Sequence, residues 1–164
     1  MDRIVIVDYN PLWVEIFQLE AEKIRAALGQ EALRIEHVGS TSVPGLAAKP
    51  IVDMVLVVAD SADENRYAPA LIATGYVLRI REPNWHEHRM FKGSVEAVNL
   101  HVFSSGCPEI ERMLAFRDWL RSNSADRDLY ARTKVELARR EWKDVQDYAD
   151  AKTAVVAEIL GRAS

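Results

Sequence analysis

The segment His37–Asp53, HVGSTSVPGLAAKPIVD, is the most informative part of this 164-residue sequence for its fold. A Gly39-Ser40 pair follows a segment with strand character, and Asp53 lies within an otherwise apolar strand. A carboxylate in a buried strand is costly unless it is paired, hydrogen-bonded or bound to a cation. The segment therefore predicts a ligand-binding loop between two strands, with a loop-capping or Lys49-paired Asp53 as the structural alternative.

The loop carries a glycine, three consecutive hydroxyl side chains and one lysine. A glycine lets the backbone approach a ligand closely, and hydroxyl groups can donate hydrogen bonds to phosphate oxygens. The lysine adds a point charge that suits either a phosphate group or the carboxylate of Asp53. The substrate-binding residues predicted in the loop are Gly39, Ser40, Thr41, Ser42 and Lys49.

Strand and helix signals surround this loop. Arg34–Val38 has the character of a strand that enters the loop, and Ile51–Val58 is the clearest strand in the sequence. Because Ile51–Val58 is apolar on both faces except at Asp53, it is predicted to be a central strand. Upstream, Ile4–Val7 is a predicted short buried strand, and Pro11–Leu28 is a predicted helix.

Downstream of the loop, the pattern changes from mixed to helical. A helix over Ala62–Ala73 is followed by strand-like segments, and beyond Pro108 there are few turn signals. The predicted strands are Tyr76–Ile80, His88–Phe91 and Val95–Phe103, with a Gly93-Ser94 hairpin turn, and the predicted helices are Pro108–Arg121 and Asp126–Leu160, with breaks near Ser122–Ser124 and Lys143. The sequence predicts one α+β domain over 1–164, in which about 1–107 form the mixed part and about 108–164 a helical part.

Composition excludes several classes of protein. The chain has 21 Lys and Arg against 25 Asp and Glu, which gives a net charge of −4 and argues against a nucleic-acid partner. The single Cys107 excludes an intramolecular disulfide and a thiolate zinc cluster. No signal peptide is recognised and no apolar run approaches the roughly 20 residues that span a bilayer, so we expect a cytoplasmic protein with no membrane partner.

The negative charge is concentrated in the first part of the chain. Residues 1–60 contain five basic and nine acidic side chains, which accounts for the whole imbalance. Between Arg34 and Arg66, the only basic side chain is Lys49. Further cations for a phosphate ligand must therefore come from the helical part, and we expect a pocket assembled from both parts.

The segment His37–Asp53 closely resembles the signature of the GrpB family, a group related to nucleotidyltransferases of the polymerase-beta type. Asn99-Leu100-His101-Val102 resembles the second strand motif of the family, and Phe116–Arg121 resembles its helix motif. The pairs Tyr130 with Lys134 and Tyr148 with Lys152 resemble its later helical positions. The resemblance covers about residues 3–160 and implies a nucleotidyltransferase-like mixed sheet with flanking helices, on which the helical C-terminal part packs.

Nucleotidyltransferases of this fold carry two acids separated by one residue on the strand after the Gly-Ser turn, and a third acid on a neighbouring strand. Residues i and i+2 of a strand share a face, so the two carboxylates can hold a pair of Mg²⁺ ions. Here Val55 occupies the second position, and His101 occupies the place of the third acid. Two-metal transfer in the usual form therefore lacks the necessary negative charge.

Asp53 and His101 are instead predicted as the catalytic residues, an acid–base pair in which the carboxylate orients the imidazole. They are also the predicted ligands if one divalent metal is bound, with Mg²⁺, Mn²⁺ and Zn²⁺ left open. His86 and His88, which share a face if they lie in a strand, would complete a zinc-type set. The alternative is that the segment around His86 is a solvated surface loop.

Basic residues outside the loop are the remaining candidates for substrate binding. The resemblance favours Arg117 and Lys134 in the helical part, and Arg89 on the hairpin strand is a third candidate. Guanidinium groups suit phosphate or carboxylate groups because they can donate two parallel hydrogen bonds. The alternative for each of these residues is ordinary pairing within a helix or a solvated face.

These observations predict binding of a nucleotide or another phosphorylated metabolite at the Gly-Ser loop, with transfer of a nucleotidyl group by altered chemistry. The expected partner is thus a small phosphorylated ligand. The alternative is a non-catalytic interaction or folding-assistance module with a protein partner. The resemblance suggests this second function, because a related domain is fused to dephospho-CoA kinase in some actinobacterial proteins. The chain itself has no Gly-x-x-x-x-Gly-Lys-Ser/Thr motif of a kinase P-loop.

Overall fold

One mixed sheet of five strands, in the order β1-β2-β5-β4-β3, organises the molecule. The computed structural model describes residues 4–93, 97–140 and 145–163. The strands β2 and β5 are parallel, and the other neighbouring pairs are antiparallel. Their bounds are β1 Arg34–Val38, β2 Val52–Val58, β3 Val77–Glu82, β4 His88–Lys92 and β5 Val98–Ser104.

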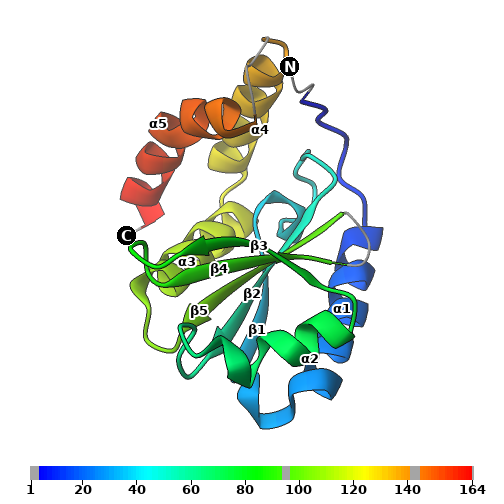
Figure 1. Ribbon diagram of the computed structural model, residues 1–164. Coiled ribbons are helices and arrows are strands. Elements are labelled where there is room, and N and C mark those ends of the chain that lie inside the picture. Colours follow the sequence, from blue (N-terminus) through cyan, green and yellow to red (C-terminus); the bar gives the residue numbers. More distant parts are fainter. Residues whose placement is uncertain (1–3, 94–96, 141–144, 164) are drawn as a thin grey trace.

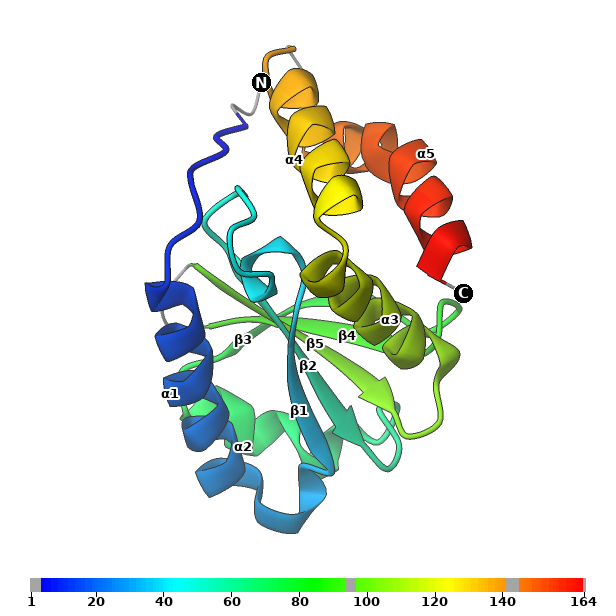
Figure 2. The ribbon, with the colours of Figure 1, turned by 180° about the vertical axis from the view of Figure 1, so that it is seen from behind.

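Helices cover both faces of the sheet and one of its ends (Figures 1 and 2). On one face lie α1 (Leu12–Leu28) and α2 (Ala68–Ala73), and on the other lies α3 (Pro108–Ser122). The helices α4 (Ser124–Ala138) and α5 (Val145–Ala163) stand beyond the end of the sheet, next to the loop between β1 and β2. Within the described residues, no helix is both long and apolar enough to cross a membrane.

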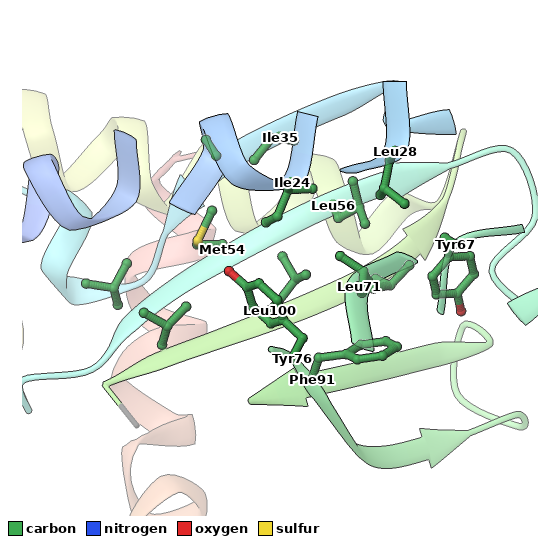
Figure 3. Close-up of a cluster of buried hydrophobic side chains, with 14 of the residues drawn as sticks. Ile24, Leu28, Ile35, Met54, Leu56, Tyr67, Leu71, Tyr76, Phe91 and Leu100 are labelled. Carbon is green, nitrogen blue, oxygen red and sulfur yellow. The ribbon is translucent and has the colours of Figure 1, made fainter. Parts of the chain in front are cut away.

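The alternation of β2 explains how the sheet is covered. Met54 and Leu56 pack with residues of α1 and α2 in the larger core, which Figure 3 shows. Val55 and Val57 point to the opposite face and pack against α3. Because alternate side chains of β2 pack on opposite faces of the sheet, the strand is apolar throughout except at Asp53. It lies between β1 and β5 as an interior strand, as predicted.

The helical part packs directly onto the loop. Val43 and Leu46, both fully buried, form a cluster with Leu120, Tyr130 and Ile159 from the three C-terminal helices. Loops rarely bury large apolar side chains unless another element covers them. The loop between β1 and β2 is therefore held between the sheet and the helices, which fixes its polar side chains in place.

Two predicted elements differ from the structure at the N-terminal side. Ile4–Val7 is not a strand: it makes a single bridge, between Val7 and Ala48, and Val5 is 50% exposed. Only Ile4 of this apolar run is buried, against α4 and α5. The predicted helix Ala62–Ala73 begins in regular form only at Ala68, where Pro69 occupies the first turn.

The remaining predicted elements are close to the observed ones. β5 begins at Val98, whereas the predicted start of this strand, Val95, lies outside the described residues, and the break between α3 and α4 falls at Asn123. Asn123 caps α4 because its side-chain oxygen accepts a hydrogen bond from the backbone N–H of Asp126 at 2.9 Å. The predicted turn residue Ser94 and the predicted break near Lys143 lie outside the described residues.

Candidate functional site

A small polar cavity of about 90 Å³ lies where the loop, the starts of β2 and β5, and the helices α4 and α5 meet. Both parts of the chain contribute to its wall, as the charge distribution predicted. The lining residues are Ser40, Ala48, Lys49, Ile51, Asp53, Asn99, Lys134, Tyr148 and Lys152. Four of them, namely Ser40, Lys49, Asp53 and Lys134, are among the predicted site residues.

The three hydroxyls of the loop point in three directions. Ser40–Ser42 form one turn of 3₁₀ helix, in which successive side chains are about 120° apart. Thr41 is buried and its Oγ1 lies 3.0 Å from Nε2 of His37, and Ser42 donates its hydroxyl to the carbonyl of Gly39. Only Ser40 therefore reaches the cavity. Thr41 and Ser42 were predicted to bind the ligand together with Ser40, but their side chains do not line the cavity.

Gly39 is required by Asp53. Its φ of +75° is in the region that favours glycine, and a Cβ at this position would stand 3.0 Å from Oδ2 and 3.3 Å from Cβ of Asp53. The close approach that the sequence predicted is thus between the backbone of the loop and a carboxylate of the site. Gly39 does not line the cavity itself, but it lets Asp53 sit against the loop.

Lys134 is the most unusual side chain of the site, because it is only 2% exposed. Its Nζ donates hydrogen bonds to Oγ of Ser40 at 2.8 Å and to the carbonyl of Ala47 at 2.6 Å. Burial, and then the charges of Lys152 and Lys49, lower the pKa of Lys134 to about 7. The side chain joins α4 to the Gly-Ser turn and brings a cation to the cavity.

Two more lysines approach the same cavity. Burial and the charge of Lys49 lower the pKa of Lys152 to about 8, and burial lowers the pKa of Lys49 as well. Their Nζ atoms lie 4.8 Å and 5.8 Å from the ring centroid of Tyr148, respectively. Lys49 comes from the loop and Lys152 from α5, so three separate segments supply the cations.

A row of hydrogen bonds leads from the cavity across the sheet. Nε2 of His101 lies 3.2 Å from Oδ1 of Asp53, Nδ1 of His101 lies 3.0 Å from Nε2 of His88, and Nδ1 of His88 lies 2.6 Å from Oε1 of Glu82. Burial lowers the pKa of His88, which favours its neutral form. The row links Asp53 to the protein surface at Glu82 through two imidazoles, and a neutral imidazole can donate at one ring nitrogen and accept at the other.

The donors around Asp53 do not fit a pair of Mg²⁺ ions. Val55, in the position of a second acid, is buried in the apolar layer under α3, and the neighbouring groups are lysine ammonium groups. In the described ranges, no three His, Cys, Asp or Glu side chains come together as metal ligands. His86 lies on an exposed turn at a φ of +55° and does not approach His101, so the predicted zinc-type set does not form.

Two predicted substrate-binding arginines lie away from the cavity. Arg89 pairs in register with Val102, on the face opposite His101, where its Nε donates to Glu64 at 2.8 Å. Arg117 donates to Glu36 and to the carbonyl of His37, both at 3.1 Å. Both guanidinium groups therefore already have protein partners, and Arg117 braces the end of β1.

Five residues of the cavity wall were not among the predicted site residues, and three of them are polar: Asn99, Tyr148 and Lys152. Oδ1 of Asn99 is buried and has no hydrogen-bond partner among the described residues. The signals for these positions were present. Asn99 shares the strand parity of His101, and the spacing of four between Tyr148 and Lys152 puts both on one face of a helix. What the sequence lacks is any sign of which helix face meets the loop.

Comparisons with known proteins identify the family. A family model described as GrpB protein matches residues 3–162. A UPF0157 protein of Halalkalibacterium halodurans is 60% identical over 161 residues, which are 98% of this chain and 83% of that protein. The crystal structure of the conserved protein GrpB from Enterococcus faecalis is 33% identical, with a TM-score of 0.86 over 97% of this chain and 96% of that one.

More distant similarities extend the comparison. Cid1 in complex with its short product ApU matches with a TM-score of 0.59 at 14% identity, over 83% of this chain and 43% of that chain. This likeness is one of fold alone, and the fold is nucleotidyltransferase-like. A dephospho-CoA kinase of Mycobacterium leprae is 28% identical over 189 residues, which cover 96% of this chain and 46% of the kinase.

Proposed function

Because the chain belongs to the GrpB family and has a nucleotidyltransferase-like fold, we propose that its cavity binds the phosphate group of a nucleotide or of another phosphorylated metabolite. The observation that carries the proposal is the convergence of Lys49, Lys134 and Lys152 on one small polar cavity. Lysine ammonium groups are common partners of phosphate oxygens.

The position of Ser40 supports the same function. Its Oγ accepts a hydrogen bond from Lys134, and both groups line the cavity at the start of β2. A Gly-Ser turn and a lysine from a distant helix thus meet at one point, as a phosphate site assembled from two parts of the chain requires. The nucleotidyltransferase-like fold favours a nucleotide as the carrier of that phosphate.

The cavity is suited to the phosphate group rather than to a whole nucleotide. Its volume of about 90 Å³ is well below the roughly 300–1,000 Å³ of pockets that enclose drug-sized ligands. The base and sugar of a nucleotide, or the remainder of another metabolite, would therefore lie outside the cavity.

Asp53 and His101 give this site a chemical role beyond binding. Asp53 lines the cavity, and His101 holds its carboxylate at 3.2 Å. In a transfer reaction, Asp53 would accept the proton of an attacking hydroxyl group, and the imidazoles behind it would stabilise the added proton. This role needs no second carboxylate at position 55.

Thermal shift with a panel of phosphorylated compounds tests the proposed function. The panel contains nucleoside mono-, di- and triphosphates and simple sugar phosphates, each with and without Mg²⁺. We expect at least one compound to raise the melting temperature of the wild-type protein, because a ligand that binds only the folded state stabilises it. The shift should vanish in Lys134→Met and remain in Lys23→Met, whose lysine lies on α1 outside the cavity wall and pairs with Glu20. A wild-type melting temperature that no compound changes would contradict the proposal.

A second function is favoured by the kinase relative. In that protein, the region similar to this chain makes up 46% of the length, beside a remainder that this chain does not match. A role as an interaction module for a dephospho-CoA kinase follows from that arrangement. Size-exclusion chromatography of this protein mixed with a separate dephospho-CoA kinase checks it, and a stable complex that Lys134→Met also forms would favour this second function. Separate elution of the two proteins would contradict it.

A further inference from the structure

The charges around the cavity are unbalanced. Three of its lining residues are lysines, and Asp53 is its single acidic lining residue. Within the described residues, none of Lys49, Lys134 and Lys152 has a carboxylate oxygen within 4.0 Å of its Nζ. A lysine as buried as Lys134 almost always has a partner of opposite charge. The cavity therefore has an excess of positive charge, which suits an anionic ligand.

Neighbouring lysines increase the positive charge at the cavity. The charge of Lys92, on β4, disfavours the charged form of Lys49, and the charges of Lys49 and Lys152 disfavour that of Lys134. Asp53 opposes this effect on Lys49 and Lys152, but it is one charge against several. An anion in the cavity would relieve the repulsion among the lysines.

A divalent cation would increase the repulsion among the lysines instead of relieving it. In a two-metal site, carboxylates hold the ions and the ions neutralise the phosphate. Here the second carboxylate position is filled by Val55 in the core, and ammonium groups stand where positive charge is needed. A Mg²⁺ ion would add two charges to an already cationic cavity, with one carboxylate to hold it.

From this arrangement we infer that the cavity takes a phosphate group as a bare dianion, neutralised by the three lysines without a divalent metal. The inference rests on the proposed function and specifies its substrate class: a phosphomonoester or a terminal phosphate, rather than the Mg²⁺ complex of a nucleoside triphosphate. Asn99 completes the cradle. Asn99 lines the cavity, and rotation of its amide by 180° would exchange the unpartnered Oδ1 for an N–H donor group.

The test is the affinity of this protein for inorganic phosphate, measured by isothermal titration calorimetry in EDTA and again in excess Mg²⁺. We expect binding in EDTA that is at least as tight as binding in Mg²⁺. Lys134→Met and Lys152→Met should each weaken it at least about tenfold, since each removes a unit charge close to the ligand. Lys23→Met, on α1 and outside the cavity wall, is the matched control and should bind phosphate like the wild type.

Asp53→Asn separates a metal site from a lysine site by the sign of its effect. If the lysines alone neutralise the phosphate, loss of the carboxylate removes a repulsion, and the affinity in EDTA should rise by several-fold. Binding that requires Mg²⁺ and disappears in Asp53→Asn would overturn the inference and leave the proposed function intact. No binding of inorganic phosphate or of any compound in the thermal-shift panel would overturn both.

Discussion

Lys134 holds a charge that the folded protein disfavours. Its pKa is about 7 in the folded state, because of burial and of two neighbouring lysines, against about 10.5 for the ordinary side chain. Between these two values, the unfolded chain carries a proton at Lys134 that the folded chain has lost. Unfolding then takes up a proton, so the free energy of unfolding must rise with pH across this window.

We therefore expect the phosphate-free protein to be more stable at about pH 9 than at about pH 7. Integrated over that range, Lys134 contributes about 2 kcal/mol to the increase. Urea denaturation at the two pH values measures it, and Lys134→Met should reduce the increase by about that amount. A wild-type stability that is flat or falls between the two pH values would contradict the unbalanced charge at Lys134.

Gly39 provides a second test at the level of single residues. Gly39→Ala puts a Cβ 3.0 Å from Oδ2 of Asp53, at a φ of +75° and a ψ of −176°, whereas Gly45→Ala puts a Cβ at a φ of +82° with no atom within 4 Å. Only the first variant therefore meets Asp53. We expect Gly39→Ala to lose about 1–2 kcal/mol more than Gly45→Ala in urea denaturation. Equal losses would mean that Asp53 moves freely.

Single residues were predicted from the sequence where their chemistry is local. Ser40, Lys49 and Asp53 lie in one short segment, and all three line the cavity. Thr41 and Ser42 have the same hydroxyl group as Ser40, but the tight turn rotates them away, and a sequence does not show where a 3₁₀ turn directs its side chains. Arg89 has a guanidinium group that suits a phosphate, but it lies on the face of β4 opposite His101.

At the level of elements, α3 fixes the position of the loop between β1 and β2 through two arginines. Arg117 donates to Glu36 and to the carbonyl of His37, and Arg121 donates to the carbonyl of Ser42 at 3.0 Å. Arg117, which was predicted to bind the ligand, and Arg121 both contact the backbone beside the Gly-Ser turn. They act on the cavity through the position of the loop.

Arg117→Gln should therefore destabilise the protein more than a typical surface substitution. Its guanidinium is 12% exposed, and hydrogen bonds to charged groups contribute about 1.5–3 kcal/mol each, so we expect a loss of about 2–3 kcal/mol. Arg112→Gln, on the same helix with a 54% exposed side chain, should change stability by less than about 0.5 kcal/mol. Urea denaturation of the two variants decides this. Equal effects would contradict a bracing role for Arg117.

The elements themselves were largely predictable, because strands and helices carry their period in the local sequence. β2 was recognised from an apolar run interrupted only at Asp53, and α3 from Pro108 onward. Ile4–Val7 was misread because an apolar run of four residues looks the same whether it pairs in a sheet or lies against helices. Its neighbours, α4 and α5, are more than one hundred residues away in the sequence.

We expect the whole molecule to unfold as one unit, since the loop and the C-terminal helices share a buried cluster. Leu46 is fully buried within it, although it lies in no regular element. Leu46→Ala should cost about 2–5 kcal/mol, as in a regular core, and Leu19→Ala, 62% exposed on α1, less than about 0.5 kcal/mol. Circular dichroism and tryptophan fluorescence should report the same unfolding midpoint for each variant. Two separate midpoints would contradict a shared core.

The net charge of the chain did not indicate the local charge of the cavity. The value of −4 argued against a nucleic-acid partner, yet the cavity is cationic because lysines from three segments converge on it. Lys134 lies 85 positions after Lys49 in the chain (134 − 49), and only the packing of α4 and α5 against the loop brings the two together. That packing, rather than any local motif, forms the site.

The most direct test of the lysine-lined phosphate site is a crystal structure of the protein grown with inorganic phosphate in the presence of EDTA. We expect a tetrahedral anion in the cavity, within hydrogen-bond distance of the Nζ atoms of Lys134 and Lys152 and of the amide of Asn99, with no metal ion beside it. A metal ion coordinated by Asp53 in crystals grown with Mg²⁺, together with a cavity that holds no phosphate in EDTA, would contradict it.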